Sequence, residues 1–304
     1  MNKLLPSPAD ITKIDLNNAK QMFDLLDCSE NTKADYKARV GDFIKHLSAD
    51  GLTKKSLLDY KKSLANNNKI SVATKNKQLI TAKRLLQIMF NAGIIPFDAS
   101  KDITGRGIKG FHQSTKHKKR GLKSDEVFKI CEYMQDSQDY RLKAILSLLI
   151  YQGLRRIEIV RLDVNDFNAN NLTLMIKGKG KDDKEPIRLH QQTATAISQY
   201  LKSTQLKTGA LFVSQSNNQA GSRLTEVSLY RLVKGLLNKL KIANSTHGFR
   251  HRFITDLIDK GFTLMQVKKV SRHSNIEMLN TYYDEVKDIE IVDEMLGSVD
   301  YQLV

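Results

Sequence analysis

The stretch STHGFRHRFITDLIDKGFTLMQVKKVSRHSNIEMLNTYY, residues 245–283, decides how the rest of the chain is organised. His247 and Arg250 stand three residues apart, so a helix places both side chains on one face. Phe253 and Leu257 continue an apolar stripe, which lets this helix seat in a core while its first turn presents an imidazole and a guanidinium. The planar fork of an arginine matches phosphate oxygens, so this turn is suited to hold a phosphate.

The end of the same stretch adds His273 and two adjacent tyrosines, Tyr282 and Tyr283. A tyrosine hydroxyl beside a phosphate grip is suited to act as a nucleophile on phosphorus. The sequence therefore predicts a phosphate-handling site on this helix and its successors.

The composition points to nucleic acid as the partner. The chain has 304 residues, enough for two domains, with 40% hydrophobic and 27% charged residues, which is typical of a globular protein. Its formal net charge is +16, and an excess of this size makes nucleic acid the first partner to consider. Charge alone also fits a merely basic protein.

Other functional classes are disfavoured. Only two cysteines occur, Cys28 and Cys131, and both lie in apolar helical patterns, which argues against a disulfide scaffold or a cysteine metal site. Pro6 and Pro8 interrupt the first residues, which lack the apolar core of a signal peptide. No apolar run reaches membrane-spanning length. We expect a cytoplasmic, nucleoid-associated protein with no cofactor, no metal and no membrane contact.

Residues 1–100 predict a helical bundle that binds DNA. Helical spacing recurs over residues 15–28, 29–51, 53–64 and 71–91, and the last helix is expected to turn Leu79, Leu86 and Phe90 inward. Its other side carries four cations, Lys75, Lys77, Lys83 and Arg84. A solvated face is the plain interpretation, but contact with a DNA backbone needs positive charge and no special geometry.

Residues 101–120 resemble an exposed basic linker. They are rich in glycine and contain one acidic residue, Asp102. We expect the run near their end to follow a phosphate backbone; its DNA-binding candidates are Lys116, Lys118, Lys119 and Arg120. His112 and His117 are expected to be solvated or to contact phosphate.

Residues 121–304 predict a mainly helical catalytic domain with a small β-sheet and a C-terminal tail. Helices are expected from Ser124 to about Gln135 and over 140–152, where Gly153 ends the second one. Residues 168–189 read as two short strands around a Gly-Lys turn, a β-hairpin. A last small helix is expected within 284–304. The fold class is mainly α with a small β-sheet.

Further polar residues are ordinary when taken singly. Arg155 has a ready salt-bridge mate in Glu158, Lys179 lies at a hairpin tip, and His-x-x-Arg on a helix is common by chance. Taken together and in order, these motifs resemble the tyrosine recombinase, or phage-type integrase, family of the Xer kind. The matching segments are GLRRIE (153–158), GKGK (178–181), HGFRH (247–251), RHS (272–274) and TYY (281–283). The motifs span roughly residues 120–296, and residues 1–100 match more loosely as a DNA-clamping domain.

The resemblance implies a role for each residue. Arg155 and Arg250 would hold the scissile phosphate, and Tyr282 would attack it to form a 3′-phosphotyrosyl bond. Lys179 would be the general acid, and His247 would assist proton transfer at the tyrosine. His273 would form a hydrogen bond to the phosphate, and Glu158 would orient a neighbouring side chain. Such a mechanism needs no metal and no ATP.

Some positions depart from the family pattern or admit two registers. Arg272 stands where the family usually has glycine, which alters the local turn and adds charge near the phosphate. Three motifs admit a second register: Tyr283 adjoins Tyr282, Arg156 adjoins Arg155, and Lys177 and Lys181 flank Lys179. His251 lies off the His247–Arg250 face and is expected to be structural.

We therefore expect a site-specific recombinase that works through a Holliday junction as a homo-tetramer on synapsed DNA, with an accessory DNA-bending or directionality protein as a further partner. Two alternatives share the fold. A type IB-like topoisomerase would relax any supercoiled plasmid, and a non-catalytic DNA-binding protein would form no covalent adduct.

Overall fold

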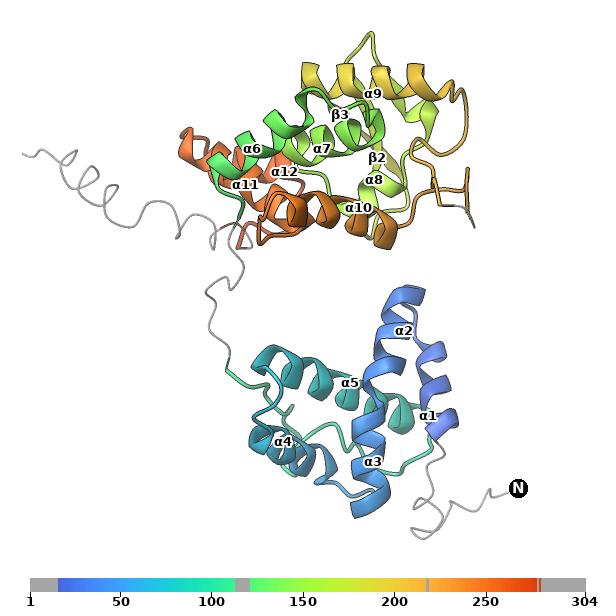
Figure 1. The fold of residues 1–304 in the computed structure, drawn as a ribbon. Helices are drawn as coiled ribbons and strands as arrows, with labels where there is room; N and C mark the ends of the chain where they lie inside the picture. The colour runs from blue at the N-terminus through green and yellow to red at the C-terminus, as the bar shows by residue number, and fades with distance from the viewer. Residues whose placement is uncertain (1–15, 113–120, 217–218, 278, 280–304) are drawn as a thin grey trace, which may run out of the picture. The chain divides into compact units, whose positions relative to one another are not determined.

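The computed structural model describes residues 16–112, 121–216, 219–277 and 279, and it divides the chain into two compact units, Met1–Ser114 and Thr115–Val304. The elements of the two units are labelled in Figure 1. Each unit has its own hydrophobic core. Among the helices in these described ranges, none is both long enough and apolar enough to cross a membrane.

The first unit is a bundle of short helices. Its elements are α1 (Leu16–Gln21), the 3₁₀ turn η2 (Met22–Leu25), α2 (Glu30–Arg39), α3 (Gly41–Asp50), α4 (Ser56–Asn66) and α5 (Val72–Asn91). The side chains of Ser29 and Ser71 cap α2 and α5 by accepting from backbone N–H groups in the first turn. The single helix expected over 29–51 is two helices, because the chain breaks at Val40, before Gly41, a residue that disfavours helix interiors.

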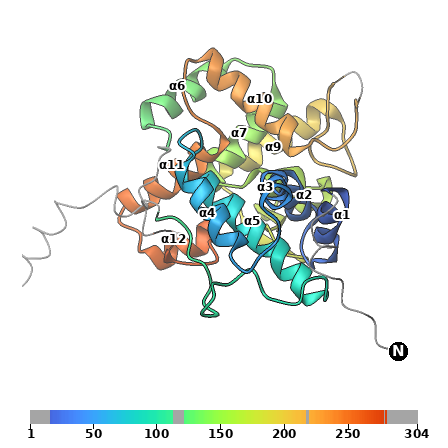
Figure 2. The same cartoon turned by 90° about the horizontal axis from the view of Figure 1, so that it is seen from below.

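The core of this unit lies around α5, which packs against α2 and α4 (Figure 2). Its buried stripe passes through Ala82, Leu86 and Met89. Phe90, expected to face inward, is 40% exposed, because it stands one position further round the helix than Met89. That expectation was wrong.

Residues 101–112 fold onto the first unit. The amide of Asn76 on α5 brackets Phe111: its Nδ2 donates to the Phe111 carbonyl at 3.0 Å, and its Oδ1 accepts from the Phe111 N–H at 2.7 Å. Ile108 and Phe111 pack against the bundle core. The unit is thus longer than the 1–100 bundle expected from the sequence, and residues 113–120 of the expected linker lie outside the described residues.

The second unit is mainly helical with one small sheet, which confirms the predicted fold class. Its elements are α6 (Ser124–Gln135), α7 (Tyr140–Gln152), α8 (Arg156–Val160), the 3₁₀ turn η3 (Val164–Asp166), β1 (Phe167–Asn168), β2 (Thr173–Lys177), β3 (Lys184–Arg188), α9 (Gln191–Thr204), α10 (Glu226–Lys239), α11 (Thr246–Asp259) and α12 (Leu264–Ser271). The strands are antiparallel in the order β1-β2-β3, with Leu174 opposite Ile187 and Lys177 opposite Lys184.

Helix α7 is the centre of this unit. It packs against both α9 and α11 (Figure 1), and every residue from Ala144 to Leu149 is buried. An apolar helix surrounded in this way suits a position inside a domain. Its end is fixed by Gly153, whose φ of +55° continues the chain in the left-handed region. In this turn the carbonyl of Gly153, two residues before Arg155 in the chain, accepts a hydrogen bond from Arg250 on α11.

Candidate functional site

The turn between α7 and α8 positions Arg155. Two bonds from this residue reach Glu158: its backbone N–H donates to Oε2 and its Nη1 to Oε1, both at 2.8 Å. Glu158 is fully buried, so its carboxylate is a fixed anchor. The neighbouring Arg156 instead lies over the ring of Tyr230 on α10, 5.3 Å from the ring centre. The two adjacent arginines thus have different partners, Glu158 for Arg155 and the Tyr230 ring for Arg156.

Arg250 lies in the first half of α11 and is only 3% exposed. Its Nη1 donates to the Gly153 carbonyl at 2.7 Å, and its Nη2 donates to the Ser271 carbonyl at 2.5 Å. Backbone from the end of α7 and from the end of α12 therefore holds this guanidinium from two sides. His247, one turn earlier on the same helix, is exposed.

His273 completes the group. The Arg250 Nη2 lies 3.4 Å from its Nε2 and 3.5 Å from its Nδ1, and the Ser271 hydroxyl is 2.7 Å from Nδ1. Burial, together with the positive charges of Arg250 and Arg155, lowers the pKa of His273 to about 4. The imidazole is therefore neutral at neutral pH, and it can donate one hydrogen bond without adding charge.

Arg272 places a third guanidinium beside the group. It ends α12 with a φ of +59°, the conformation for which glycine is the usual residue. Its Nη2 lies 3.4 Å from Glu158 Oε2 and 3.4 Å from the Gln152 carbonyl, while its own carbonyl accepts from Arg155 Nη2 at 3.4 Å. The sequence indicated extra charge at this position, but it gave no sign that Arg272 pairs with Glu158.

Glu158 thus serves two arginines at once. Burial would raise the pKa of its carboxyl, but Arg272 and Arg155 outweigh that effect and hold the pKa below its ordinary value. The carboxylate is therefore ionised, and it partly neutralises a site that otherwise gathers several positive groups.

Lys179 lies at the exposed tip of the β2–β3 hairpin, next to Gly180 with its φ of +75°. The flanking lysines lie near carboxylates: Lys177 is 4.0 Å from Asp182, and Lys181 is 4.0 Å from Glu185. Within the described residues Lys179 forms no ion pair. Lys179 therefore differs from its two neighbouring lysines, each of which lies near a carboxylate.

Tyr282 and Tyr283 lie outside the described residues. Leu279 is described: it is fully buried in a small core with Ile254, Ile258 and Val267 of α11 and α12. The described chain therefore runs to within three residues of Tyr282 in the sequence.

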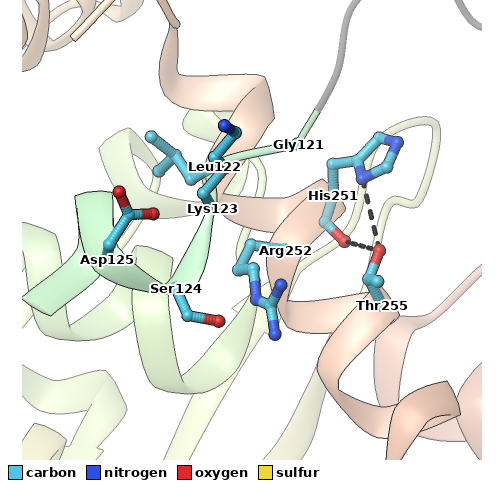
Figure 3. Close-up of a pocket in the computed structure, with 8 residues that line it drawn as sticks. All are labelled: Gly121, Leu122, Lys123, Ser124, Asp125, His251, Arg252 and Thr255. Carbon is cyan, nitrogen blue, oxygen red and sulfur yellow. Dashed lines mark hydrogen bonds between the residues drawn. The ribbon is translucent and has the colours of Figure 1, made fainter.

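His251 belongs to a different place from Arg250. It is 4% exposed, and its Nδ1 lies 3.3 Å from the Thr255 hydroxyl (Figure 3). It lines a pocket between the start of α6 and α11, together with Arg252, Thr255 and residues 121–125. A Cβ built on Gly121 would lie 2.5 Å from its ring nitrogen, so the strap leading into α6 packs closely on this histidine.

The candidates for DNA contact on α5 do not form one face. Lys75 is only 8% exposed; its ammonium donates to the Ala65 carbonyl at 3.0 Å and lies 5.8 Å from the Phe111 ring centre. Its expected place on the solvated side was wrong, because this stem and charge are used inside the unit. Lys77 and Arg84 are exposed and, seven residues apart, share a face; Lys83 is half-buried. Lys116, Lys118, Lys119 and Arg120 lie outside the described residues.

The structure thus brings together Arg155, Glu158, Arg250 and His273, with Arg272 added, from α8, α11 and the chain after α12. Two guanidiniums and a neutral imidazole gathered in one part of the unit suit an oxyanion such as a phosphodiester. In the described part of the chain, no group of three or more His, Cys, Asp or Glu side chains could hold a metal ion.

Comparisons with known proteins bear on this geometry. The phage integrase family model matches residues 120–288, more than half of the chain. The chain is 27% identical over 298 residues to the tyrosine recombinase slr0733 of Synechocystis sp., covering 92% of this chain and 94% of that protein. It is 26% identical over 275 residues to the tyrosine recombinase XerD of Oceanobacillus iheyensis, covering 84% and 87%.

Two solved structures share the fold. The Tn1549 transposon integrase in complex with transposon right end DNA matches with a TM-score of 0.72 at 17% identity, covering 93% of this chain and 99% of that chain. The XerH site-specific recombinase bound to a palindromic difH substrate matches with a TM-score of 0.68 at 18% identity, covering 94% and 85%. At this level of identity the likeness concerns the fold.

Proposed function

Because this chain belongs to the phage integrase family and is a site-specific tyrosine recombinase, we propose that it cuts and rejoins DNA strands through a 3′-phosphotyrosyl intermediate on Tyr282. The observation that carries the proposal is the cluster of Arg155, Arg250 and His273, in which two guanidiniums are held by a buried carboxylate and by backbone carbonyls around a neutral imidazole.

The two arginines bind the non-bridging oxygens of the scissile phosphate. Negative charge builds on these oxygens in the transition state, so donors fixed beforehand lower the barrier most. Arg250 is fixed by the Gly153 and Ser271 carbonyls and Arg155 by Glu158, so little reorganisation remains to be made when DNA arrives.

His273 donates a hydrogen bond to the same phosphate. When the Ser271 hydroxyl donates to Nδ1, the single proton of the neutral ring resides on Nε2, which is then the donor. The low pKa of His273 keeps the ring neutral, so the histidine adds no further positive charge to a site that already contains three arginines.

The chemical step needs two proton transfers, one from the attacking tyrosine and one to the leaving oxygen. The Tyr282 oxygen attacks phosphorus and loses its proton, with His247 assisting that transfer. The bond from phosphorus to the 5′ oxygen breaks, and the Lys179 ammonium gives a proton to the departing oxygen, which is otherwise a poor leaving group. Because the phosphotyrosyl bond conserves the energy of the phosphodiester, rejoining needs no ATP.

We further propose that four copies of the chain assemble on two DNA sites and exchange strands through a Holliday junction, with an accessory DNA-bending or directionality protein. The solved structures of the Tn1549 integrase and of XerH are complexes of those proteins with DNA, which supports duplex DNA as the partner. The first unit, with the exposed Lys77 and Arg84, is the proposed clamp on the DNA backbone.

A trapping experiment tests the proposal. A nicked duplex that carries the protein's own recombination site is incubated with wild type, Tyr282→Phe or Tyr283→Phe. Covalent adducts are read as a shift on a denaturing gel. Wild type and Tyr283→Phe should trap DNA, whereas Tyr282→Phe should not. Failure of Tyr283→Phe alone would move the nucleophile by one residue. Binding without any adduct would favour a non-catalytic protein, and relaxation of plasmids that lack the site would favour a topoisomerase.

A further inference from the structure

Helix α8 carries an arginine at each end, and only the first has been given a role. Arg155 is its N-terminal cap residue, whereas Arg161 is the residue at its C-terminal end. Arg161 is half-buried, and its Nη1 donates to the carbonyl of Gly178 at 3.1 Å. Gly178 is the residue immediately before Lys179. Arg161, at the end of α8, therefore contacts the backbone that carries Lys179, the proposed general acid.

The Gly178 carbonyl is the atom that closes the hairpin turn. It also accepts from the backbone N–H of Lys181, at 3.3 Å, so the turn that contains Lys179 and Gly180 starts and ends on this oxygen. A carbonyl oxygen has two lone pairs, so both donors can be satisfied. Holding this one atom fixes the origin from which the Lys179 side chain extends.

The strand pair next to the turn is anchored separately. Lys184 on β3 donates to Asp163 and Asp166 at distances of 2.6 to 2.9 Å, and Arg223 pairs with Asp163 at 2.5 Å. These contacts hold the last strand pair before the turn, in which Lys184 lies opposite Lys177. Lys179 lies beyond them at an exposed tip, where a lysine stem with four rotatable bonds has most freedom.

We propose that Arg161 is a positioning residue for the general acid: by holding the Gly178 carbonyl, it sets the place of the Lys179 ammonium relative to the phosphate held by Arg155 at the other end of the same helix. The inference rests on the proposed function, because it takes Lys179 as the acid. It goes beyond that proposal in naming the residue that couples the two halves of the site.

The leaving group supplies a specific test. In DNA whose bridging 5′ oxygen is replaced by sulfur, the departing group is a thiolate. A thiol has a pKa of about 8.5, far below the roughly 15.7 of water, so the sulfur leaves without receiving a proton. A variant that has lost only its acid should therefore be slow on oxygen-bridged DNA and close to wild type on sulfur-bridged DNA. A variant with a distorted phosphate site should be slow on both.

The experiment measures single-turnover cleavage at saturating protein on the two versions of the nicked duplex. Lys179→Ala sets the benchmark, with an expected loss on the order of 10²–10⁴-fold on oxygen. Arg161→Ala retains the acid but misplaces it, so we expect a loss of roughly ten- to a hundredfold on oxygen. With sulfur, both variants should come within about threefold of wild type, because no proton is then needed.

Two further variants sharpen the comparison. Arg161→Lys keeps one donor within reach of the carbonyl and should recover much of the loss on oxygen. Arg188→Ala is the matched control, because Arg188 on β3 also donates a single bond, to the Asn171 carbonyl at 3.1 Å, but at the opposite end of the hairpin. It should leave the ratio of oxygen to sulfur rates unchanged.

Each remaining outcome decides between ideas. If sulfur rescues Lys179→Ala but not Arg161→Ala, the positioning role is wrong and the proposed acid stands. If sulfur rescues neither, the assignment of Lys179 fails, and the inference falls with it. A loss of affinity for the uncleaved duplex in Arg161→Ala, equal for both bridging atoms, would make Arg161 a DNA contact instead. A rate on oxygen equal to that of wild type would also overturn the proposal.

Discussion

At Glu158, one buried carboxylate organises two guanidiniums. Arg155 binds it through both backbone and side chain, and Arg272 approaches the second oxygen at 3.4 Å. Buried charges are tolerated only when they are paired and hydrogen-bonded, since desolvation of each is costly. Glu158 is therefore the residue on which the charge balance of the site depends.

Substituting this carboxylate by its amide tests that balance. Glu158→Gln keeps the shape but leaves two partly buried arginines facing an amide, so we expect a loss of about 3 kcal/mol in the free energy of unfolding, measured by urea denaturation. Glu185→Gln is the control, because its carboxylate is 46% exposed and 4.0 Å from Lys181, and it should change stability by less than about 0.5 kcal/mol. Equal losses in the two variants would contradict the idea.

His273 predicts a pH dependence of stability. Its folded-state pKa, about 4, is below the ordinary 6.5, so the unfolded chain binds more protons between these values and stability falls as the pH drops from 6.5 towards 4. Near pH 5 the loss from this residue should be about 2 kcal/mol. His273→Gln cannot titrate, so the difference between its unfolding free energy and that of wild type should narrow over this window. A constant difference would mean that the histidine titrates normally when folded.

At the scale of elements, the end of α7 decides where the arginines meet. Gly153 turns the chain out of α7, its carbonyl accepts from Arg250, and a Cβ at this position would lie 2.4 Å from the ring of Phe253 on α11. One glycine thus supplies the turn, the close approach of two helices and a hydrogen-bond acceptor for the Arg250 guanidinium.

Gly153→Ala should therefore be strongly destabilising. The left-handed conformation costs an alanine about 1–2 kcal/mol, and the contact with Phe253 adds to it, so we expect a total loss of about 2–4 kcal/mol in thermal or urea unfolding. Gly235→Ala on the exposed side of α10 is the matched control: nothing lies within 4 Å of its added Cβ, and helix propensity should stabilise the protein by up to about 1 kcal/mol. Changes of the same sign in both variants would refute this account.

The element bounds show how far local pattern reaches. Helices α6 and α7 begin and end at the residues expected, since serine, acidic residues and Gly153 mark them locally. The apolar stripe around Val40 predicted one helix, but the structure has two. Two short consecutive helices that bury the same side give the same apolar spacing as one straight helix, so the pattern does not distinguish them. Phe90 was misplaced for a related reason: near a helix end, neighbours decide which side is inside.

At the scale of the whole molecule, charge dominates. A net charge of +16 favours binding to a phosphate backbone of any sequence, and displaced counterions make such binding weaken as salt rises. The buried ammonium of Lys75 donates to a backbone carbonyl of its own unit, so we expect it to contribute nothing to this salt-dependent binding.

Salt dependence tests this division. For binding to non-cognate duplex, Lys77→Gln combined with Arg84→Gln should lower the slope of log affinity against log salt by about 2, because each phosphate contact contributes about 0.9. Lys75→Gln, on the same helix, should leave the slope unchanged, since its ammonium already donates to Ala65. Binding is measured by fluorescence anisotropy on samples shown to be folded. An equal fall in all variants would mean that the helix presents no particular face to DNA.

The sequence by itself determined the helices with clear caps, the hairpin, the helical class and the motifs that point to a phosphate site. These properties follow from spacing over a few residues and from side-chain chemistry. Only the tertiary structure decided how the site is held: Arg250 between the Gly153 and Ser271 carbonyls, Arg272 on Glu158, Arg161 on Gly178, and a neutral His273. Arg155 and Arg272 stand 117 residues apart in the chain, and no local pattern encodes which backbone carbonyl a guanidinium meets once the cores have packed.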